Sequence, residues 1–294
     1  MTRRGRGTTL GAFIVGALGS VAAAALLKGR PPGGLERWIR KNHAGHPVTL
    51  FEGPAYAVGA VAGALAGGAG RPAAVAGLGA AAFGALDDLV GDGSSKGLRG
   101  HLAAARRGEV TTGAIKMVGL GATGLLTARM IDRSHERCGV MGTLVGGAVI
   151  AGSANIANLL DLRPGRALKV VLLLAAPIVA RGCGARPSAA TATATATATV
   201  AAAAGAAIGA LPDDLAGRSM LGDTGANSAG ALLGTSIVAR TGPRGRLLAL
   251  AVVTALTLAS EKVSFTKVIE STPGLRELDA LGRPPWSSPT ASLK

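Results

Sequence analysis

Nine apolar stretches alternate with short polar segments along the chain. They lie at residues 8–27, 54–70, 73–86, 112–130, 139–154, 168–181, 191–211, 226–239 and 247–260. Several are shorter than the roughly 20 residues that a perpendicular helix needs to cross a bilayer core of about 30 Å. We expect those spans to include flanking residues, to tilt, or to thin the bilayer. The pattern predicts an all-α fold, a polytopic integral membrane bundle of about nine transmembrane helices.

The composition agrees with a membrane protein. Hydrophobic residues make up 48% of the chain, charged residues only 16%, and the mean hydropathy is +0.40, which is too apolar for an ordinary soluble protein. Small residues let membrane helices approach closely, so Gly59-x-x-x-Gly63 is a candidate helix contact, although a bias toward alanine and glycine explains such a pair equally well. Residues 191–199 alternate Thr and Ala like a strand, but an isolated strand would leave its backbone unsatisfied in a bilayer. We therefore predict a helix there, with a span that starts near Ala196 as the alternative.

The net charge of +15 raises the question of nucleic acid binding. The basic residues are scattered among short loops, and aromatic residues for base stacking make up only 2% of the chain, so we expect no nucleic acid partner. Anionic lipid head groups and phosphorylated substrates fit the charge better.

Lysine placement predicts the orientation. The lysines follow odd-numbered spans or, for Lys116, lie just inside the fourth span on the same side, and they are Lys28, Lys41, Lys96, Lys116, Lys169, Lys262, Lys267 and Lys294. By the positive-inside rule these loops are cytoplasmic, with the amino terminus outside and the carboxyl terminus inside. We expect a transmembrane domain over residues 1–260 and a cytoplasmic tail over 261–294. Hydrophobic residues among the tail's charges predict a short amphipathic helix at the membrane surface.

Three polar clusters interrupt the apolar pattern at span ends. Asp223 lies between glycines at the start of the apolar run 226–239, Asp87-Asp88 close another run, and Asn155-x-x-Asn158-x-x-Asp161 close a third. With nine spans all three clusters come out on the cytoplasmic face. Ionisable groups at such positions mark functional sites by default, and an enzyme that joins a water-soluble donor to a lipid acceptor needs its polar groups at one interface.

Helical spacing places the third cluster on one side of its helix. Asn155, Asn158 and Asp161 fall within roughly a third of the circumference and can face one cleft. Amide and carboxylate oxygens suit Mg²⁺, while hydrogen bonding between helices plus an end cap is an equally good reading. One carboxylate of Asp87-Asp88 can act as a base or orient an acceptor phosphate, and a solvated loop is the alternative.

The basic residues near these clusters have two readings as well. Arg163 and Arg166 follow Asp161 directly and offer guanidinium groups to a diphosphate, or to lipid head groups at the surface. Lys116 lies within the start of an apolar span, where it meets an anion or extends to the interface. His43 and His46 lack further ligands for zinc in their loop, so we expect no histidine metal site.

In this order, these residues resemble the polyprenyl-phosphate N-acetylhexosamine-1-phosphate transferase superfamily, which includes phospho-N-acetylmuramoyl-pentapeptide transferase. The resemblance extends over most of the chain. Its segments are residues 40–47 (Arg-Lys-Asn-His-Ala-Gly-His-Pro), Asp87-Asp88, Lys116, Asn155-x-x-Asn158-x-x-Asp161, and residues 220–225 (Met-Leu-Gly-Asp-Thr-Gly).

The resemblance implies specific roles. Asp223 would bind Mg²⁺, for which Mn²⁺ could substitute, and Asp87, Asp88 and Asp161 would form the catalytic set, with Asp87 or Asp88 handling the acceptor phosphate. The phosphates and nucleotide of the substrate would be contacted by Lys116, Asn155, Asn158, Arg163, Arg166 and Asp213. The implied activity is transfer of a sugar-1-phosphate from a UDP-N-acetylhexosamine-like nucleotide sugar to polyprenyl phosphate, releasing UMP. It would start a lipid-linked cell-envelope glycan at the plasma membrane, with the site facing the cytoplasm, and a homodimer is compatible with the sequence.

Three departures from the family pattern leave other functions open. Pro164 stands where the family's third motif carries a second acid, Asp213 stands where an asparagine is common, and residues 261–283 lack the histidine-rich loop of the muramoyl-pentapeptide enzyme. A catalytically silent relative that binds lipid phosphates is the main alternative. A small transporter would need broken helices and charges in mid-span, and this chain carries its charges at span ends. Cys138 and Cys183 both fall near the predicted outer surface, where they either pair or remain free.

Overall fold

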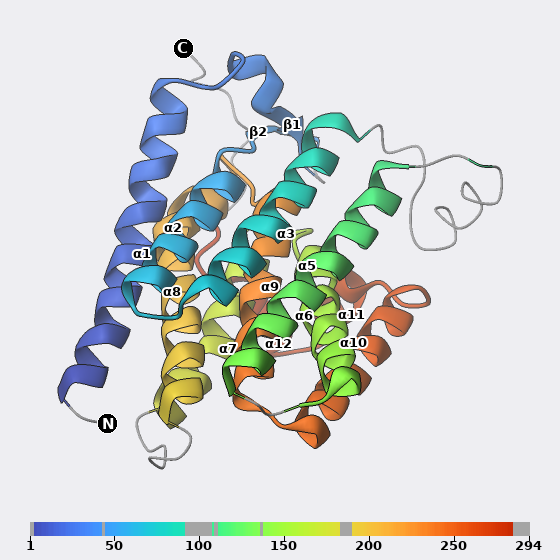
Figure 1. Cartoon of the computed structure of the whole chain (residues 1–294). Coiled ribbons are helices and arrows are strands. Elements are labelled where there is room, and N and C mark those ends of the chain that lie inside the picture. The colour runs from blue at the N-terminus through green and yellow to red at the C-terminus, as the bar shows by residue number, and fades with distance from the viewer. Residues whose placement is uncertain are drawn as a thin grey trace.

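The computed structural model describes residues 3–42, 45–91, 108, 111–135, 138–182 and 190–284. Within them the chain is mostly α-helical and forms one bundle, shown in Figure 1. The long helices are α1 (Arg3–Gly29), α2 (Glu52–Ala66), α3 (Arg71–Val90), α5 (Thr112–His135), α6 (Val140–Leu160), α7 (Arg166–Gly182), α8 (Ala190–Leu215), α9 (Gly222–Arg240) and α10 (Pro243–Ser260). Each covers one of the apolar runs, so the all-α bundle is confirmed.

Among the described residues, five helices are long and apolar enough to cross a membrane by length and composition. These segments are Thr8–Gly29, Arg71–Val90, Thr112–Arg133, Val140–Leu160 and Ala192–Leu215, and a sixth results if α10 and the following short helix form one span bent by 91°. Large apolar side chains point outward from these helices, among them Leu26 at 73% exposure and Val118 at 74%. Such faces are typical of contact with lipid or a partner.

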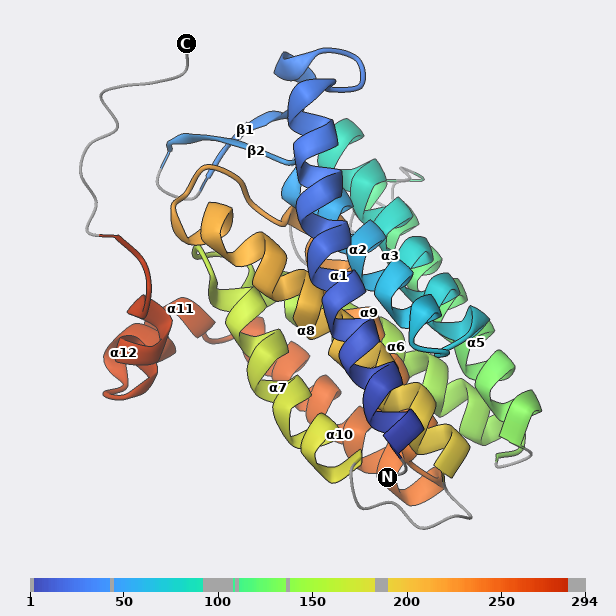
Figure 2. The ribbon, with the colours of Figure 1, turned by 90° about the vertical axis from the view of Figure 1, so that its left-hand side faces the viewer.

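Helix α9 is not among these five segments, although it is 19 residues long. Nearly all of its residues are buried, including Asn227, Ser228 and Ser236, because other helices surround it. A helix that contacts protein on every side does not need an apolar surface for lipid. In Figures 1 and 2 it lies inside the bundle, between α3, α6 and α8.

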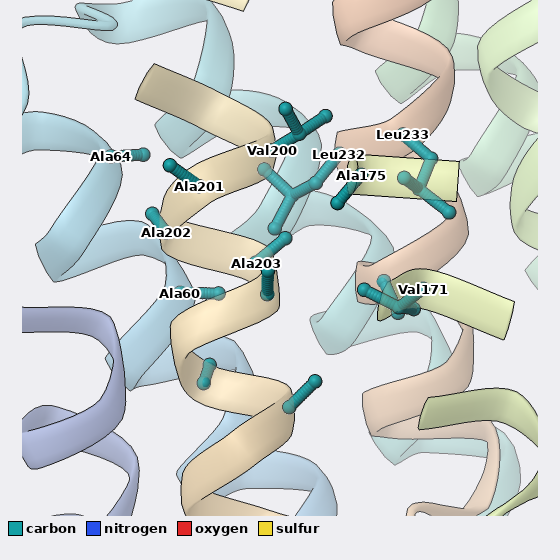
Figure 3. Close-up of a cluster of buried hydrophobic side chains, with 14 of the residues drawn as sticks. Ala60, Ala64, Val171, Ala175, Val200, Ala201, Ala202, Ala203, Leu232 and Leu233 are labelled. Atoms are coloured by element: carbon teal, nitrogen blue, oxygen red, sulfur yellow. The ribbon is translucent and has the colours of Figure 1, made fainter. Parts of the chain in front are cut away.

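The core is built from small side chains. Figure 3 shows Ala60 and Ala64 of α2 facing Ala201 and Ala202 of α8, with Leu232 of α9 nearby. A Cβ on Gly63 would overlap the Ala12 carbonyl, and one on Gly59 would lie 2.7 Å from the Gly16 carbonyl, so these glycines let α2 pack directly on α1. The predicted contact through Gly59-x-x-x-Gly63 is thus confirmed. The Thr-Ala repeat is also helical, as part of α8.

Two groups of small elements lie outside the long helices of the described residues. The segment between α1 and α2 carries a 3₁₀ turn (η1, Leu35–Trp38) and an antiparallel hairpin of β1 (Ile39–Lys41) and β2 (Pro47–Thr49). The tail forms two short helices, α11 (Phe265–Ser271) and α12 (Leu275–Ala280), which Figure 2 shows beside the start of α7. The sequence analysis predicted one short helix in the tail and did not predict the hairpin.

Candidate active site

Three helix ends bring charged side chains together at one end of the bundle. Asp87 lies in the last turn of α3, Lys116 in the second turn of α5, and Asp223 in the first turn of α9. The Lys116 ammonium donates to Asp87 Oδ2 at 2.7 Å and also contacts Asp223 Oδ2. The side chains of Lys116, Asp87 and Asp223 are 16%, 22% and 20% exposed, so solvent and substrate can reach them. We call this group the lysine-bridged carboxylates.

Asp88 caps helix α9. Its Oδ1 accepts from the Asp223 amide at 3.0 Å, and its Oδ2 accepts from the Thr224 amide at 2.8 Å and the Thr224 hydroxyl at 2.6 Å. The first amides of a helix have no partner inside the helix and carry partial positive charge. Asp88 satisfies them from another helix and thereby fixes Asp223. The sequence treated Asp87 and Asp88 alike, whereas the structure gives them different surroundings.

Tight backbone contacts hold these helix ends in place. A Cβ on Gly84 of α3 would overlap the Asp223 carbonyl, and one on Gly53 of α2 would overlap the Leu221 carbonyl. Arg40 in β1 donates to the Asp88 carbonyl through Nη2 at 2.7 Å and Nε at 3.2 Å. Small residues and one arginine therefore set the distance between the ends of α3 and α9.

The hairpin of β1 and β2 secures the segment that leads into α9. Met220 donates its amide to the Thr49 carbonyl at 3.0 Å, and the Ser219 hydroxyl donates to the same carbonyl at 2.9 Å. The hairpin and the segment 220–225 are thus parts of one local structure.

A second group of acids lies next to the lysine-bridged carboxylates. Asp161 follows the end of α6, and burial raises its pKa well above the usual range. The carboxylates of Asp214, Asp223 and Asp88 raise it further, while a hydrogen bond from the Gly222 amide opposes the rise. Asp161 therefore lies close to the start of α9.

Glu52 and Asp214 belong to this second group, and the sequence analysis did not single them out. Glu52 is 3% exposed at the start of α2, and neither carboxylate oxygen has a hydrogen-bond partner within the described part of the chain. Burial raises its pKa well above normal, and Asp214 and Asp161 add to the shift. The position of Asp214 beside Asp213 could have indicated that it belongs to the site. For Glu52 the sequence offers no such signal, because it precedes an apolar run without any motif around it.

A pocket of about 240 Å³ opens beside Asp161 and Asp214. Lys41 and Arg163 line it as well, so acids and bases face the same space. A pocket with both charges suits a ligand that has phosphate groups and hydrogen-bond donors.

The remaining predicted substrate contacts lie in varied environments. Asn155 and Asn158 are half-buried on α6, and their side-chain amides make no hydrogen bond to another described residue. Asp213 binds Lys28 and accepts from Arg218 Nε at 2.9 Å, so its charge is already paired.

Arg163 and Arg166 contact the tail. Arg163 donates to Glu270 at 2.7 Å, and Arg166, 3% exposed, donates to Asp279 and Thr266. All three nitrogens of the Arg166 guanidinium donate to protein, and we leave Arg166 out of the proposed substrate contacts for that reason. Cys138 forms no disulfide with a described residue. His43 and Cys183 lie outside the described residues, so the two alternatives for the cysteines, paired or free, both stay open.

The donor set fits Mg²⁺. Asp87 and Asp223 direct one oxygen each at a single cation, the Lys116 ammonium. Mg²⁺ is usually held by one or two carboxylates, with waters and substrate phosphates completing the shell. In the part of the chain that the structure describes, no three His, Cys, Asp or Glu residues could hold a metal by themselves. An ion here would therefore share its ligands with a substrate.

Comparison with known proteins adds no family. The chain matches no protein-family model, and no curated protein matches it significantly. The geometry described above therefore carries the functional argument.

Proposed function

We propose that this protein is an integral membrane transferase that moves a sugar-1-phosphate from a UDP-N-acetylhexosamine-like donor to polyprenyl phosphate and releases UMP. The observation that supports it most is the meeting of Asp87, Lys116 and Asp223 from three separate helices at one bundle end. An adjoining pocket carries Asp161. A diphosphate substrate needs carboxylates that bind a metal ion, cations that bind its phosphates, and a pocket beside them.

The proposed topology has nine spans with the amino terminus outside. Helices α3, α6 and α8 end at the site, whereas α5, α7 and α9 begin there, so successive helices run in opposite directions. This alternation supports a membrane crossing by each of the nine main helices, including α2, which is the shortest of them, and the buried α9. The lysines near the same end favour a site at the cytoplasmic face of the plasma membrane.

The reaction forms one bond and breaks one. An oxygen of the acceptor phosphate attacks the β-phosphorus of the donor, the bond between the two donor phosphates breaks, and UMP leaves with the electron pair. Mg²⁺, held by Asp223 and Asp87, would neutralise the diphosphate and stabilise the charge on the leaving group.

The chain's own residues bind and orient the reactants. Lys116 donates to phosphate oxygens from between the two carboxylates, and Asp87 orients the acceptor phosphate. Asp88 keeps Asp223 at the start of α9 rather than contacting substrate. Asp161 and the half-buried Asn158 face the donor from the end of α6. The donor is bound from the cytoplasm, and the prenyl chain remains in the bilayer.

Incubation of membranes with radiolabelled UDP-N-acetylhexosamine and polyprenyl phosphate tests the proposal. We expect a Mg²⁺-dependent labelled lipid and equimolar UMP, and a loss of roughly 10²-fold or more in Asp223→Ala. Glu36→Ala is the matched control, because Glu36 is an exposed acid in η1. Full activity of Asp223→Ala, or no labelled lipid with any common donor, would contradict the proposal.

A catalytically silent relative is the second candidate. The observation that favours it is that Lys116 already binds both carboxylates, while Arg163 and Arg166 are paired with the tail. Such a protein would bind polyprenyl phosphate with the same affinity in the presence and absence of donor and would release no UMP. Equilibrium binding of labelled polyprenyl phosphate beside the turnover assay separates the two candidates.

A further inference from the structure

Arg166 joins the start of α7 to both tail helices. Its Nε donates to Asp279 Oδ1 at 2.7 Å and its Nη2 to Asp279 Oδ2 at 3.1 Å, while Nη1 donates to the Thr266 hydroxyl at 2.9 Å. Arg166 and Asp279 are 3% and 9% exposed. A two-pronged arginine–carboxylate pair away from water fixes direction as well as distance.

Two more cations strengthen this joint. Lys169 donates to the carbonyls of Leu278 at 3.1 Å and Leu281 at 3.0 Å, at the end of α12. Arg283 binds the Asp279 carboxylate and also donates from Nε to the Pro164 carbonyl at 3.0 Å. The last of these bonds connects the tail directly to the loop between α6 and α7.

That loop is held from its other side by the acid group of the candidate site. The Gly165 amide donates to Asp214 Oδ2 at 2.9 Å. Gly165 has a φ of +75°, and a Cβ there would overlap the Leu215 side chain, so the loop turns tightly against the end of α8. Asp161 begins the same loop.

We infer that Arg166 is a positioning residue, and that tail helices α11 and α12 form a clamp that holds the loop of Asp161 against Asp214. The inference rests on the proposed function, because it gives Asp161 a role toward the donor. It also explains why Arg163 and Arg166 contact the tail rather than the pocket. In this arrangement the tail helices fix the loop between α6 and α7, and that loop lines the pocket. The phosphate charge is then left to Lys116 and Lys41.

The clamp should matter for rate more than for binding. Its loss frees the loop by a small distance, and a misplacement of about 1 Å can lower a rate by about 10²-fold. Lysine in place of Arg166 keeps the charge but loses the two-pronged geometry, so it should restore only part of the effect.

The test compares Arg166→Gln, Arg166→Lys and Asp279→Asn with the control Arg276→Gln. Arg276 pairs only with Glu277 on the exposed face of α12, so its loss leaves the clamp intact. Amide hydrogen exchange at Gly165 and Arg166 reports on the loop in every variant, whether or not the protein has activity. Transfer kinetics give kcat and KM separately.

We expect Arg166→Gln and Asp279→Asn to raise exchange at Gly165 and Arg166 at least tenfold. Exchange in α9 should stay unchanged, and kcat should fall tenfold to a hundredfold, with KM within about twofold. Arg166→Lys should lie between these variants and wild type.

Loop exchange and kcat equal to wild type would overturn the clamp, and so would exchange that rises equally in α9. If Arg166→Gln does not fold, Arg163→Gln gives the milder test through the partly exposed Glu270 pair. A wild-type protein without transfer would refute the proposed function, and loop exchange alone would then decide the clamp.

Discussion

A buried ion pair at the opposite end of the bundle gives the sharpest stability prediction. Arg246 of α10 donates to both carboxylate oxygens of Asp132 in α5, at 2.6 and 2.9 Å. The Thr143 hydroxyl donates to Asp132 at 2.7 Å, and the Gly142 carbonyl accepts from Arg246 at 2.9 Å. Arg246 is 0% exposed and Asp132 is 4% exposed. The pair joins α5, α6 and α10.

Loss of one partner should cost far more than loss of a surface pair. Removal of Asp132 leaves a buried guanidinium charge without its carboxylate partner, which costs about 3–5 kcal/mol. The pair of Arg276 and Glu277, with side chains 61% and 56% exposed, is screened by solvent and contributes little to stability. The loss of unfolding free energy should therefore be much larger for the buried pair.

Equilibrium unfolding in mixed micelles measures both. We expect Asp132→Ala to lower the free energy of unfolding by about 3–5 kcal/mol, and Glu277→Ala, the matched control on the exposed surface, to lower it far less. The double variant Asp132→Leu with Arg246→Met should regain most of the loss, because a packed apolar pair replaces a buried ion pair at little cost.

Transfer activity at moderate temperature should survive in Asp132→Ala. Lys116 and Asp132 are 16 residues apart on α5, which is about 24 Å along the helix axis. An Asp132→Ala protein as stable as Glu277→Ala would refute the reasoning, since Arg246 would then have reached water or another partner.

Three further predictions concern the site and the tail. Lys116→Met should reduce UMP release by roughly 10²-fold while the helical circular dichroism stays unchanged; activity within twofold of wild type would contradict the role of Lys116. Gly84→Ala should lower stability by about 1–3 kcal/mol by overpacking against the carbonyl of Asp223, whereas Gly121→Ala, with open space around its Cβ, should be neutral or stabilising by up to about 1 kcal/mol. Burial alone would raise the pKa of Asp279, but its arginine partners lower it below the usual value. Its stabilisation of the tail is therefore present above the unfolded pKa of about 4 and is lost as pH falls through the lower folded value. Limited proteolysis of the wild-type tail should begin only below about pH 4. The tail of Asp279→Asn should be cleaved at neutral pH as readily as the wild-type tail is at low pH.

The hydropathy pattern predicted the helices because each apolar run coincides largely with one long helix, although the run 54–70 extends past the end of α2 at Ala66. The run 73–86 widens to Arg71–Val90 and thereby includes Asp87 and Asp88 in the last turn of α3. The pattern could not say which carboxylate faces Lys116, since adjacent helical residues point about 100° apart and only the neighbouring α9 decides between them.

The sequence analysis could not predict the ion pairs between residues far apart in the chain. Nothing in the spacing of Arg166 and Asp279, 113 residues apart, indicates that they meet. The sequence analysis predicted phosphate binding by Arg163 and Arg166 from their residue type and their position after Asp161. The contact depends on the 91° bend between α10 and α11, which returns the tail to the start of α7.

The site's geometry follows from packing more than from loops. Asp223 is fixed by the bond from its amide to Asp88 and by the glycine contact at Gly84, both between α3 and α9. Lys116 arrives on α5, which packs against α3 along its length and places Thr123 next to Gly79. Because these three helices touch through small residues, a side chain added at Gly84 changes the separation of the carboxylates directly. Long flexible segments could not hold two like charges so close to one ammonium, whereas helices locked by backbone contacts can do so before any substrate arrives.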